Sequence, residues 1–456
     1  MAVTRHEADT AHKGKGLPVV SGSTLALMPT EGRDVADSRG FIGDLFAAVQ
    51  AAPPVKSVEV MARLLKERFF ALDVSFLITD LGGNAVVRLT GFDEDEGPGE
   101  PQPVPLAGTV YERVIRSQQL WVDDGKDRTD AAGQSAAQVI APVSDRGDTI
   151  GVLELELPEP PDHQTLQRIS EAARALAYVV IVNKRFTDLY EWGRRTTRMS
   201  LASEIQHRLL PESFTCDAGP FTVAGALEPA ANIGGDTFDY VLNRRGLHLS
   251  LTDAMGHDVR AAQLATVVVS ALRNARRAGL GLAAQASAAN IAVAEHAVRE
   301  HRAVVEESAQ VHHALAEHGA QAMATGQLLW VSFETGNAVF VNAGHVWPLL
   351  LREGEVEEIT PIVDLPFGVD PQHGYHVQSL DLRPGDRLVL ITDGMLEPNG
   401  NHRALRDLIR ETGNQHPRDA VRTFTRSVLE ATDHDPRDDA TVLCLEWSGS
   451  AWADLP

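Results

Sequence analysis

The stretch NIGGDTFDY, residues 232 to 240, places two aspartates close together directly after a pair of glycines. Carboxylates have no place in a hydrophobic core, because an uncompensated buried charge is costly. Three more motifs of the C-terminal half place an aspartate where an apolar run meets a loop. They are LTDAMGHD (251–258), LITDGMLEP (390–398) and DDATVLCLEW (438–447). This recurrence indicates one site that is built from several strand ends.

Carboxylates that converge at strand ends lose hydration and repel one another, so they need cations between them. A set of oxygen ligands without histidine or cysteine favours Mg²⁺ or Mn²⁺. Glycines allow the backbone to turn sharply and to approach such ions closely. Those beside the aspartates are Gly234, Gly235, Gly256 and Gly394. Taken singly, each motif is more often a turn or a solvated cap, so only the four together favour a metal site.

The overall composition limits which classes of protein are possible. The chain has 456 residues, 43% of them hydrophobic and 23% charged, which is typical of a globular protein of about three domain-sized units. A formal charge of -22 disfavours binding to nucleic acid or to a membrane surface. The only cysteines, Cys216 and Cys444, lie far apart, so we expect neither a disulfide framework nor a thiolate metal site. Without an apolar signal core or spanning run, a cytoplasmic location is expected.

The N-terminal third predicts a leader and one domain. Residues 1–38 are polar and lack periodicity, which predicts a disordered leader. Residues 39–161 alternate helical spacing with β-rich runs joined at Gly82–Gly83 and at 145–147, which predicts an α+β domain with an antiparallel sheet. This block resembles a GAF domain, a sensory module, in element order and in its closing pattern APV...IGVLELEL. The resemblance implies an unknown small-molecule or protein signal, and a purely structural dimerisation domain is the alternative.

Residues 162–211 predict a helical connector that is almost continuous until Pro211. Its apolar residues recur at a spacing of three and four, which suits a parallel coiled coil in a homodimer. These residues are Leu166, Ile169, Ala173, Leu176, Val180, Leu201, Ile205 and Leu209. Helices that pack on their own domains are the alternative, which Gly193 also allows. In a coiled coil, Leu176→Asp is expected to alter regulation or dimerisation and to leave basal activity.

Residues 212–447 predict a second α+β block, and 448–456 a short tail. Turn signals at 335–337 and 352–354 predict a meander of strands, and residues 259–278 predict a long amphipathic helix. This block resembles the metal-dependent serine/threonine phosphatases of the PPM family (type 2C), in their bacterial SpoIIE/RsbU-like branch. Besides the aspartate motifs, the matching pieces are LASEIQHRLLP, GALEPAANIGGDTFDY, NAGHVWPLLL, DLPFGV and LRPGDRLVLITDGMLEP. The implied fold is an α-β-β-α sandwich of two antiparallel sheets.

The resemblance also implies a site and a function. Two Mn²⁺ or Mg²⁺ ions would be held by Asp236, Asp253, Asp393 and Asp438, with Asp253 bridging them and Ala254 contributing its backbone carbonyl. The positions expected to support these ligands are Asp239, Gly235, Gly256, His257, Gly394 and Asp439, with Asp239 orienting the loop or bound waters. Two such ions activate a water and clamp the oxygens of a phosphoryl group. The implied substrate is phosphoserine or phosphothreonine on a regulatory protein, which in relatives is an anti-sigma-factor antagonist.

The sequence departs from the family pattern in several places. Thr237 and Phe238 replace the common tryptophan and tyrosine, and Asp258 replaces a second glycine and is expected to lie exposed. Residues 297–323 are a long stretch rich in alanine, glutamate and histidine. Its histidines are expected to form a solvated helix face; they are His301, His312, His313 and His318. The motifs identify no arginine as a phosphate clamp.

Three other functions compete with this reading. GGDTF is similar to the GGDEF signature of diguanylate cyclases, but Thr237 stands where a cyclase needs a carboxylate. A catalytically silent scaffold that binds a partner is the more serious alternative, although no expected metal-binding aspartate is missing. A ligand-binding transcriptional regulator is disfavoured by the acidic charge and by the lack of a recognisable helix-turn-helix.

Overall fold

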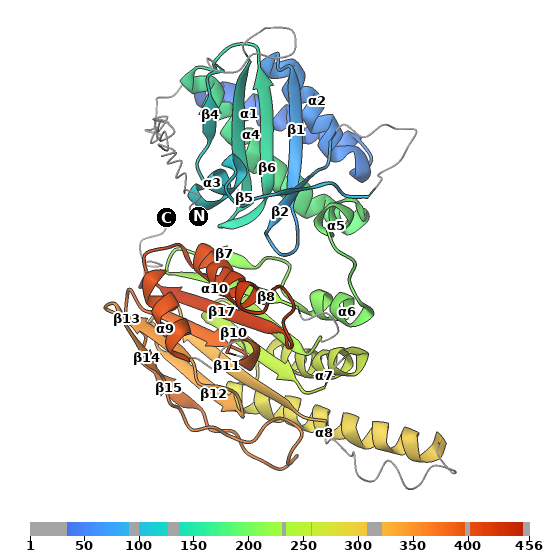
Figure 1. Ribbon diagram of the computed structural model, residues 1–456, viewed down its shortest axis with the longest axis vertical. Coiled ribbons are helices and arrows are strands. Elements are labelled where there is room, and N and C mark those ends of the chain that lie inside the picture. Colours follow the sequence, from blue (N-terminus) through green and yellow to red (C-terminus); the bar gives the residue numbers. More distant parts are fainter. Residues whose placement is uncertain are drawn as a thin grey trace, which may run out of the picture.

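The computed structural model describes residues 34–90, 100–125, 136–229, 234–256, 258–307, 322–396 and 402–449. They form two lobes stacked along the long axis of the molecule (Figure 1). The predicted leader lies outside the described residues up to residue 33. From Asp34 onward the chain is helical, so the last residues of that leader are not disordered as predicted. The predicted tail lies outside the described residues from residue 450 onward.

The N-terminal lobe contains one antiparallel sheet with the strand order β3-β2-β1-β6-β5-β4. Its strands are β1 (Asp73–Thr79), β2 (Ala85–Arg88), β3 (Pro103–Pro105), β4 (Trp121–Asp123), β5 (Ala137–Asp145) and β6 (Asp148–Leu157). The two predicted turns join β1 to β2 and β5 to β6, so both predicted hairpins are confirmed. One face is covered by α1 (Asp34–Ala51), α2 (Ser57–Phe69) and α4 (His163–Asn183), and the other by α3 (Val110–Ser117).

The prediction of an almost continuous connector helix is wrong. The chain forms separate segments: α4, the 3-10 turn η2 (Lys184–Phe186), α5 (Leu189–Arg194) and α6 (Leu201–Leu209). The apolar residues of α4 from Ile169 to Val180 are buried in the N-terminal core, whereas Leu201 is 65% exposed. The alternative, in which the helices pack on their own lobes, is therefore confirmed for α4. Leu176→Asp would place a charge in this core and would not test a coiled coil.

The C-terminal lobe contains two antiparallel sheets with the strand orders β15-β12-β11-β10-β9 and β14-β13-β16-β17-β8-β7. The five-stranded sheet consists of β9 (Asp236–Leu242), β10 (Gly246–Ala254), β11 (Ala324–Ser332), β12 (Ala338–Ala343) and β15 (Gln378–Leu380). The six-stranded sheet consists of β7 (Thr215–Asp217), β8 (Phe221–Glu228), β13 (Leu349–Arg352), β14 (Glu355–Glu358), β16 (Arg387–Ile391) and β17 (Ala440–Trp447). The two predicted turns of the meander join β11 to β12 and β13 to β14, as expected.

The two sheets of this lobe pack face to face and are covered by helices on their outer faces. Residues such as Phe221, Phe238 and Leu443 fill the core between the sheets. Helices α7 (Asp258–Arg277) and α8 (Leu282–Glu307) cover the five-stranded sheet, and α9 (His402–Glu411) and α10 (Pro417–Ala431) cover the other. Because both faces are covered, β16 is buried at every position. The predicted α-β-β-α sandwich and the α+β fold class are confirmed.

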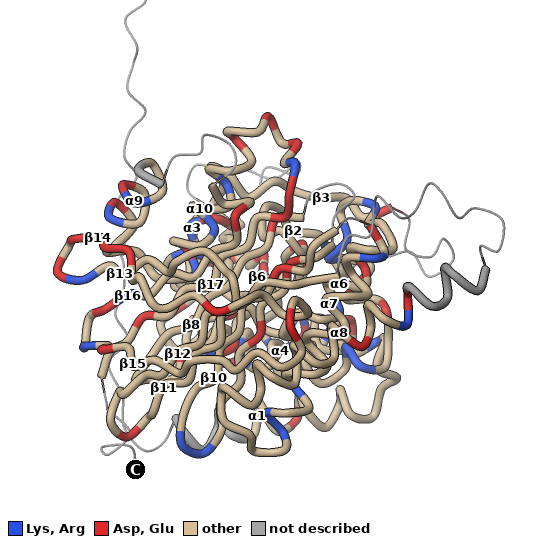
Figure 2. The backbone as a smooth tube through the Cα atoms, turned by 90° about the horizontal axis from the view of Figure 1, so that it is seen from below, with Lys and Arg blue, Asp and Glu red and all other residues tan. Residues whose placement is uncertain are grey.

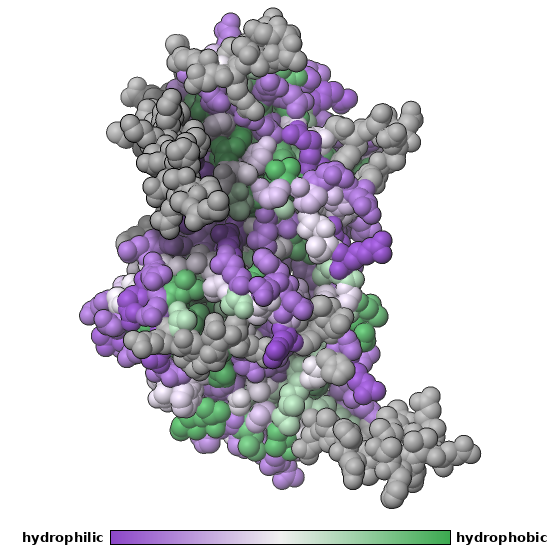
Figure 3. Space-filling model, viewed as in Figure 1, coloured by the Kyte–Doolittle hydropathy of each residue, from purple (hydrophilic) through white to green (hydrophobic). Residues whose placement is uncertain are grey.

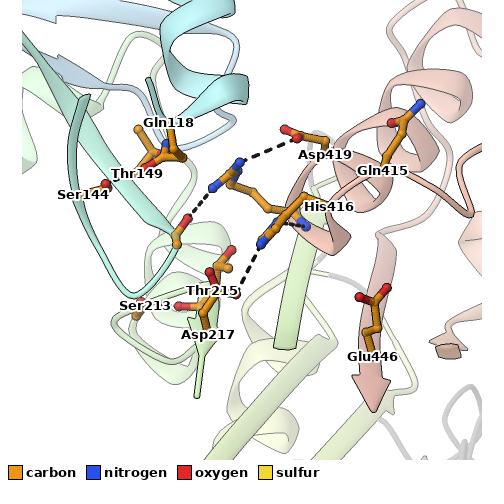
Figure 4. Close-up of polar contacts among 12 residues, drawn as sticks. Gln118, Ser144, Thr149, Ser213, Thr215, Asp217, Gln415, His416, Asp419 and Glu446 are labelled. Carbon is orange, nitrogen blue, oxygen red and sulfur yellow. Dashed lines mark hydrogen bonds and ion pairs between the residues drawn. The ribbon is translucent and has the colours of Figure 1, made fainter. Parts of the chain in front are cut away.

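The lobes meet where the turn between β5 and β6 contacts β7 and the start of α10. Arg418 Nη1 donates to the Gly147 carbonyl over 2.7 Å, and its Nη2 donates to the Arg116 carbonyl over 3.2 Å. Figure 4 shows His416 facing Asp217, with Nε2 3.2 Å from Oδ1. The contact of His416 lies within the C-terminal lobe, whereas the two hydrogen bonds of Arg418 join the lobes.

Acidic and basic residues are interspersed along the backbone tube in Figure 2. Within the described chain, no helix combines the length and the apolarity that crossing a membrane requires.

Candidate active site

Asp236 and Asp253 lie opposite each other on neighbouring strands of the five-stranded sheet. Asp236 begins β9 and Asp253 lies near the end of β10, and the strand register pairs the two residues directly. In an antiparallel pair the start of one strand adjoins the end of the next, so both carboxylates occupy one edge of the sheet. Asp236 is buried, and Asp253 is half-buried.

Asp393 and Asp438 reach the same edge from the six-stranded sheet. Asp393 follows the end of β16, and Asp438 precedes the start of β17, which is the antiparallel neighbour of β16. Asp393 is exposed, and Asp438 is half-buried. The structure therefore brings the four aspartates predicted from the motifs to one edge of the sandwich.

The carboxylates of this edge raise one another's pKa values. Burial, and then the charges of Asp253 and Asp439, raise the pKa of Asp236 well above its ordinary value. Burial, and then three further aspartates of the edge, raise the pKa of Asp253 to about 7. Burial is also the main reason why the pKa of Asp438 is raised, with Asp393 adding to it. Negative charge thus accumulates here beyond what the nearby protein groups compensate.

Two threonine hydroxyls hold the Asp236 carboxylate from the opposite sheet. Thr392 Oγ1 donates to Asp236 Oδ2 over 2.7 Å, and Thr441 Oγ1 donates to the same oxygen over 2.6 Å. Since Thr392 follows β16 and Thr441 lies in β17, these bonds tie the two sheets together at the site. Neither threonine is predicted from the sequence as a site residue, although both lie inside the motifs LITDG and DDAT. The sequence feature that could have indicated them is a hydroxyl residue close to an aspartate at the end of a strand.

Gln206 connects α6 to the site. Its Nε2 donates to the Asp439 carboxylate over 2.5 Å and to the backbone carbonyl of Asp236 over 2.9 Å. The Gln206 side chain is buried, and α6 is capped by Ser200, whose hydroxyl accepts from the Ser203 N–H. No sequence pattern indicates this contact, because a glutamine in an amphipathic helix does not reveal what it faces.

Gly235 and Gly394 are required because neighbouring backbone passes too close for a side chain. A Cβ at Gly235 would overlap the carbonyl oxygen of Ala254, and a Cβ at Gly394 would overlap the carbonyl oxygen of Asp439. Both carbonyls lie at the edge that carries the aspartates. These glycines were expected to let the backbone come close to metal ions. In the structure, each of them lets its own backbone come close to another backbone segment.

Asp239 forms ion pairs with two arginines of α7, and its predicted role of orienting the loop or bound waters stays a prediction. Arg273 donates to both of its carboxylate oxygens, over 3.1 and 3.2 Å, and Arg276 donates to Oδ2 over 3.0 Å. Because both arginines belong to α7, the ion pairs anchor that helix to β9. The register pairs Asp239 with Ser250, away from the pair formed by the edge aspartates. The arginines lie more than thirty positions later in the chain, where no local pattern could indicate them.

His345 gives the NAGH motif a structural role. Its Nε2 lies 2.9 Å from the Ile391 carbonyl, and its Nδ1 lies 2.6 Å from Thr325 Oγ1. Burial lowers the pKa of His345 to about 4, so the ring is neutral near pH 7. Asn342 accepts from the His345 N–H over 2.7 Å and closes the loop. The histidine thus fixes the end of β16, next to Asp393.

The remaining predictions concern the start of α7 and the end of α8. His257 lies outside the described residues. Asp258 is exposed, as expected, and has a φ of 58°, which lies in the left-handed region and explains why glycine is usual there. The helical stretch predicted over 297–323 is α8 up to Glu307, and residues 308–321 lie outside the described residues. The side chains of its four histidines are outside them too.

The chemistry of the site fits a hard divalent cation. Among the described residues, no three acidic, histidine or cysteine side chains are close enough together to form a finished metal site. The groups at the edge are nevertheless carboxylates and a backbone carbonyl, which are the ligands that Mg²⁺ and Mn²⁺ prefer. Cations would also compensate the charge that raises the pKa values of Asp236 and Asp253.

A helix-flanked sandwich of two antiparallel sheets, with aspartates of both sheets at one edge, is the arrangement of a metal-dependent protein phosphatase. Residues 243–448 match the family model described as Stage II sporulation protein E (SpoIIE). The C-terminal lobe is thus a SpoIIE-type phosphatase domain of the PPM class. The matched region begins after Asp236. The assignment of Asp236 to the site therefore rests on its sequence motif and on its position at the aspartate edge. The comparison with curated proteins gives no match.

Solved structures with a similar fold include several bacterial phosphatase domains. The RsbU and RsbW domains of Rv1364c from Mycobacterium tuberculosis are 25% identical, with 50% of this chain and 60% of that chain covered and a TM-score of 0.38. The SiaA-PP2C domain of Pseudomonas aeruginosa is 20% identical, with coverages of 49% and 84% and a TM-score of 0.38. The phosphatase domain and regulatory fragment of SpoIIE from Bacillus subtilis are 13% identical, with coverages of 91% and 96% and a TM-score of 0.40. Because these TM-scores are low, the class of the domain rests on the family match and the motifs.

Proposed function

We propose that this chain is a metal-dependent phosphatase that removes phosphate from serine or threonine of a regulatory protein. The observation that carries the proposal is the meeting of strand-end aspartates from both sheets at one edge, with raised pKa values at Asp236 and Asp253. That edge belongs to a SpoIIE-type domain. A phosphorylated anti-sigma-factor antagonist is the proposed substrate, by resemblance to the SpoIIE/RsbU branch.

The proposed ligands of two Mn²⁺ or Mg²⁺ ions are the Ala254 carbonyl and the carboxylates of Asp236, Asp253, Asp393 and Asp438. When bound, such ions polarise phosphoryl oxygens and make an attacking water more acidic. The chain itself fixes the carboxylates before any substrate arrives. The hydroxyls of Thr392 and Thr441 orient Asp236, and Gln206 orients Asp439.

We also propose that the N-terminal lobe is a GAF-like sensor that controls the phosphatase domain. Support comes from the direct contacts of Arg418 with that lobe, and from α6, which follows the N-terminal lobe in the chain and reaches the site through Gln206. A homodimer stays a prediction.

The test is hydrolysis of an aryl phosphate and of a phosphothreonine peptide by the full chain with Mn²⁺, Mg²⁺ or a chelator. We expect metal-dependent turnover that falls by more than about 100-fold in Asp253→Asn and in Asp393→Asn. Loss of a residue that only hydrogen-bonds to a metal ligand already lowers metal affinity or activity by about 10- to 100-fold. Asp407→Asn, at an exposed carboxylate on α9, is the matched control and should retain activity.

Two results would contradict the proposal. Turnover that persists in a chelator would exclude metal-dependent chemistry at this edge. Absence of turnover with every metal, in folded protein, would favour the catalytically silent scaffold instead.

A further inference from the structure

A cavity of about 230 Å³ lies between the two lobes. The N-terminal lobe lines it with the β1–β2 turn and α5, and the C-terminal lobe lines it with β8 and α10. Hydrophilic residues dominate the visible surface where the lobes meet (Figure 3). Inside, apolar side chains such as Ile78, Val180 and Phe214 stand beside charged ones. Neither the aspartate edge nor the SpoIIE-type domain alone contains this cavity.

Most charged groups that line the cavity are satisfied by the protein. Lys184 forms an ion pair with Glu212 at 2.9 Å, and Arg194 lies 3.9 Å from Glu191. Asp80 accepts hydrogen bonds from two backbone N–H groups of the β1–β2 turn and from a threonine hydroxyl. These groups therefore have no need of a ligand.

Arg422 of α10 is different. Its guanidinium lies against the β1–β2 turn, since a Cβ at Gly83 would come within 3.1 Å of Nε and Nη2. Within the described parts of the chain, that guanidinium makes no hydrogen bond and no ion pair. Burial lowers the pKa of Arg422, against the smaller opposing effects of carboxylates that include Asp148 and Asp80. A half-buried guanidinium with unused donors suits a planar, two-oxygen acceptor.

A second polar group of the cavity also lacks a partner. The hydroxyl of Tyr190 is buried and has no hydrogen-bond partner among the residues described. Tyr190 belongs to α5 of the N-terminal lobe, so the unused groups come from both lobes. A buried donor without an acceptor is unfavourable for the folded protein.

We propose that the cavity binds a small organic carboxylate, whose charged end is held by Arg422 and whose body lies against the apolar wall. The mixed wall favours such a molecule over an inorganic anion, because inorganic anions gain nothing from apolar contact. A ligand there touches both lobes at once. It also lies beside β8, whose last residue, Glu228, pairs with Ala440, the residue after Asp439. A ligand in the cavity is therefore connected through β8 to the edge that carries the aspartates. Binding of the carboxylate in this cavity does not depend on phosphatase activity.

The experiment is thermal unfolding of the full chain without metal, in acetate, benzoate or inorganic phosphate, each matched with sodium chloride at equal ionic strength. We expect benzoate at millimolar concentration to raise the Tm by about 2–4 °C, with a smaller rise in acetate. The rise should disappear in Arg422→Gln and shrink in Arg422→Lys, which keeps the charge but loses the fork. Arg426→Gln, at an exposed arginine one turn further along α10, should keep the full rise.

Three results would overturn the proposal. One is the absence of any rise in both carboxylates, and another is an equal rise in Arg422→Gln. A rise in phosphate alone would exclude the carboxylate class. Loss of phosphatase activity bears only on the proposed function, because this readout needs neither metal nor substrate.

Discussion

Single residues decide how the Asp236 carboxylate is held. Its Oδ2 accepts two hydroxyl hydrogen bonds from the other sheet, while burial and two neighbouring aspartates raise its pKa. Hydroxyls fix the orientation of a carboxylate without adding charge, so they leave its negative charge available to a cation.

Removal of either hydroxyl should therefore weaken metal binding. We expect Thr392→Val and Thr441→Val to raise the Mn²⁺ concentration needed for half-maximal activity by about 10- to 100-fold. Titration of activity with Mn²⁺, together with calorimetry of Mn²⁺ binding, checks this. Thr237→Val is the control, because the Thr237 hydroxyl contacts that of Thr252 over 2.6 Å and not the Asp236 carboxylate. An unchanged Mn²⁺ requirement in both variants would show that the hydroxyls do not position the ligand.

At the scale of elements, β8 of one sheet and β9 of the other pack tightly against each other. Gly225 of β8 faces the ring of Phe238 of β9, and a Cβ on Gly225 would overlap that ring. Phe238 is buried and makes an edge contact with Phe214 at a centroid distance of 5.2 Å. The glycine thus sets how closely the sheets that carry the aspartates can pack.

Gly225→Ala should strain this contact. We expect a loss of about 1–3 kcal/mol in the free energy of unfolding, which is the usual cost of an overpacked core. Urea unfolding of the variant should show a lower midpoint with the same slope. Gly374→Ala provides the control, because an added methyl group there meets nothing within 4 Å. Equal midpoints for Gly225→Ala and wild type would mean that the sheets can separate without cost.

At the scale of the whole molecule, the lobes are connected both by the chain and by polar contacts of α10. Arg418 is buried and donates to carbonyls of two different segments of the N-terminal lobe. Hydrogen bonds from a charged donor contribute about 1.5–3 kcal/mol, so this one side chain is a substantial part of the contact.

Arg418→Ala should let the lobes separate. We expect faster amide hydrogen exchange in the β5–β6 turn at residues 145–148 and a larger radius of gyration in solution scattering. Arg426→Ala, on an exposed position of the same helix, should change neither measurement. Unchanged exchange and size in Arg418→Ala would show that the chain connection alone fixes the arrangement of the lobes.

Local sequence patterns predict the fold class and the hairpins, and the resemblance to the PPM family predicts the phosphatase character of the C-terminal half. Alternating apolar runs, turn residues and strand-end aspartates are local signals, and each is readable within about ten residues. The motifs around Asp236, Asp253, Asp393 and Asp438 could be placed at strand ends for that reason, and the structure brings them to one edge.

What each side chain faces depends on how distant segments of the chain pack together. The stripe of α4 fits a coiled coil and a domain core equally well in sequence, and its packing on the N-terminal sheet settles the choice. Asp239 belongs to the same motif as Asp236, yet the arginines of α7 hold it elsewhere. Gln206 and Arg422 are ordinary helix residues until other elements approach them. Such contacts join segments far apart in the chain, and therefore no local pattern encodes them.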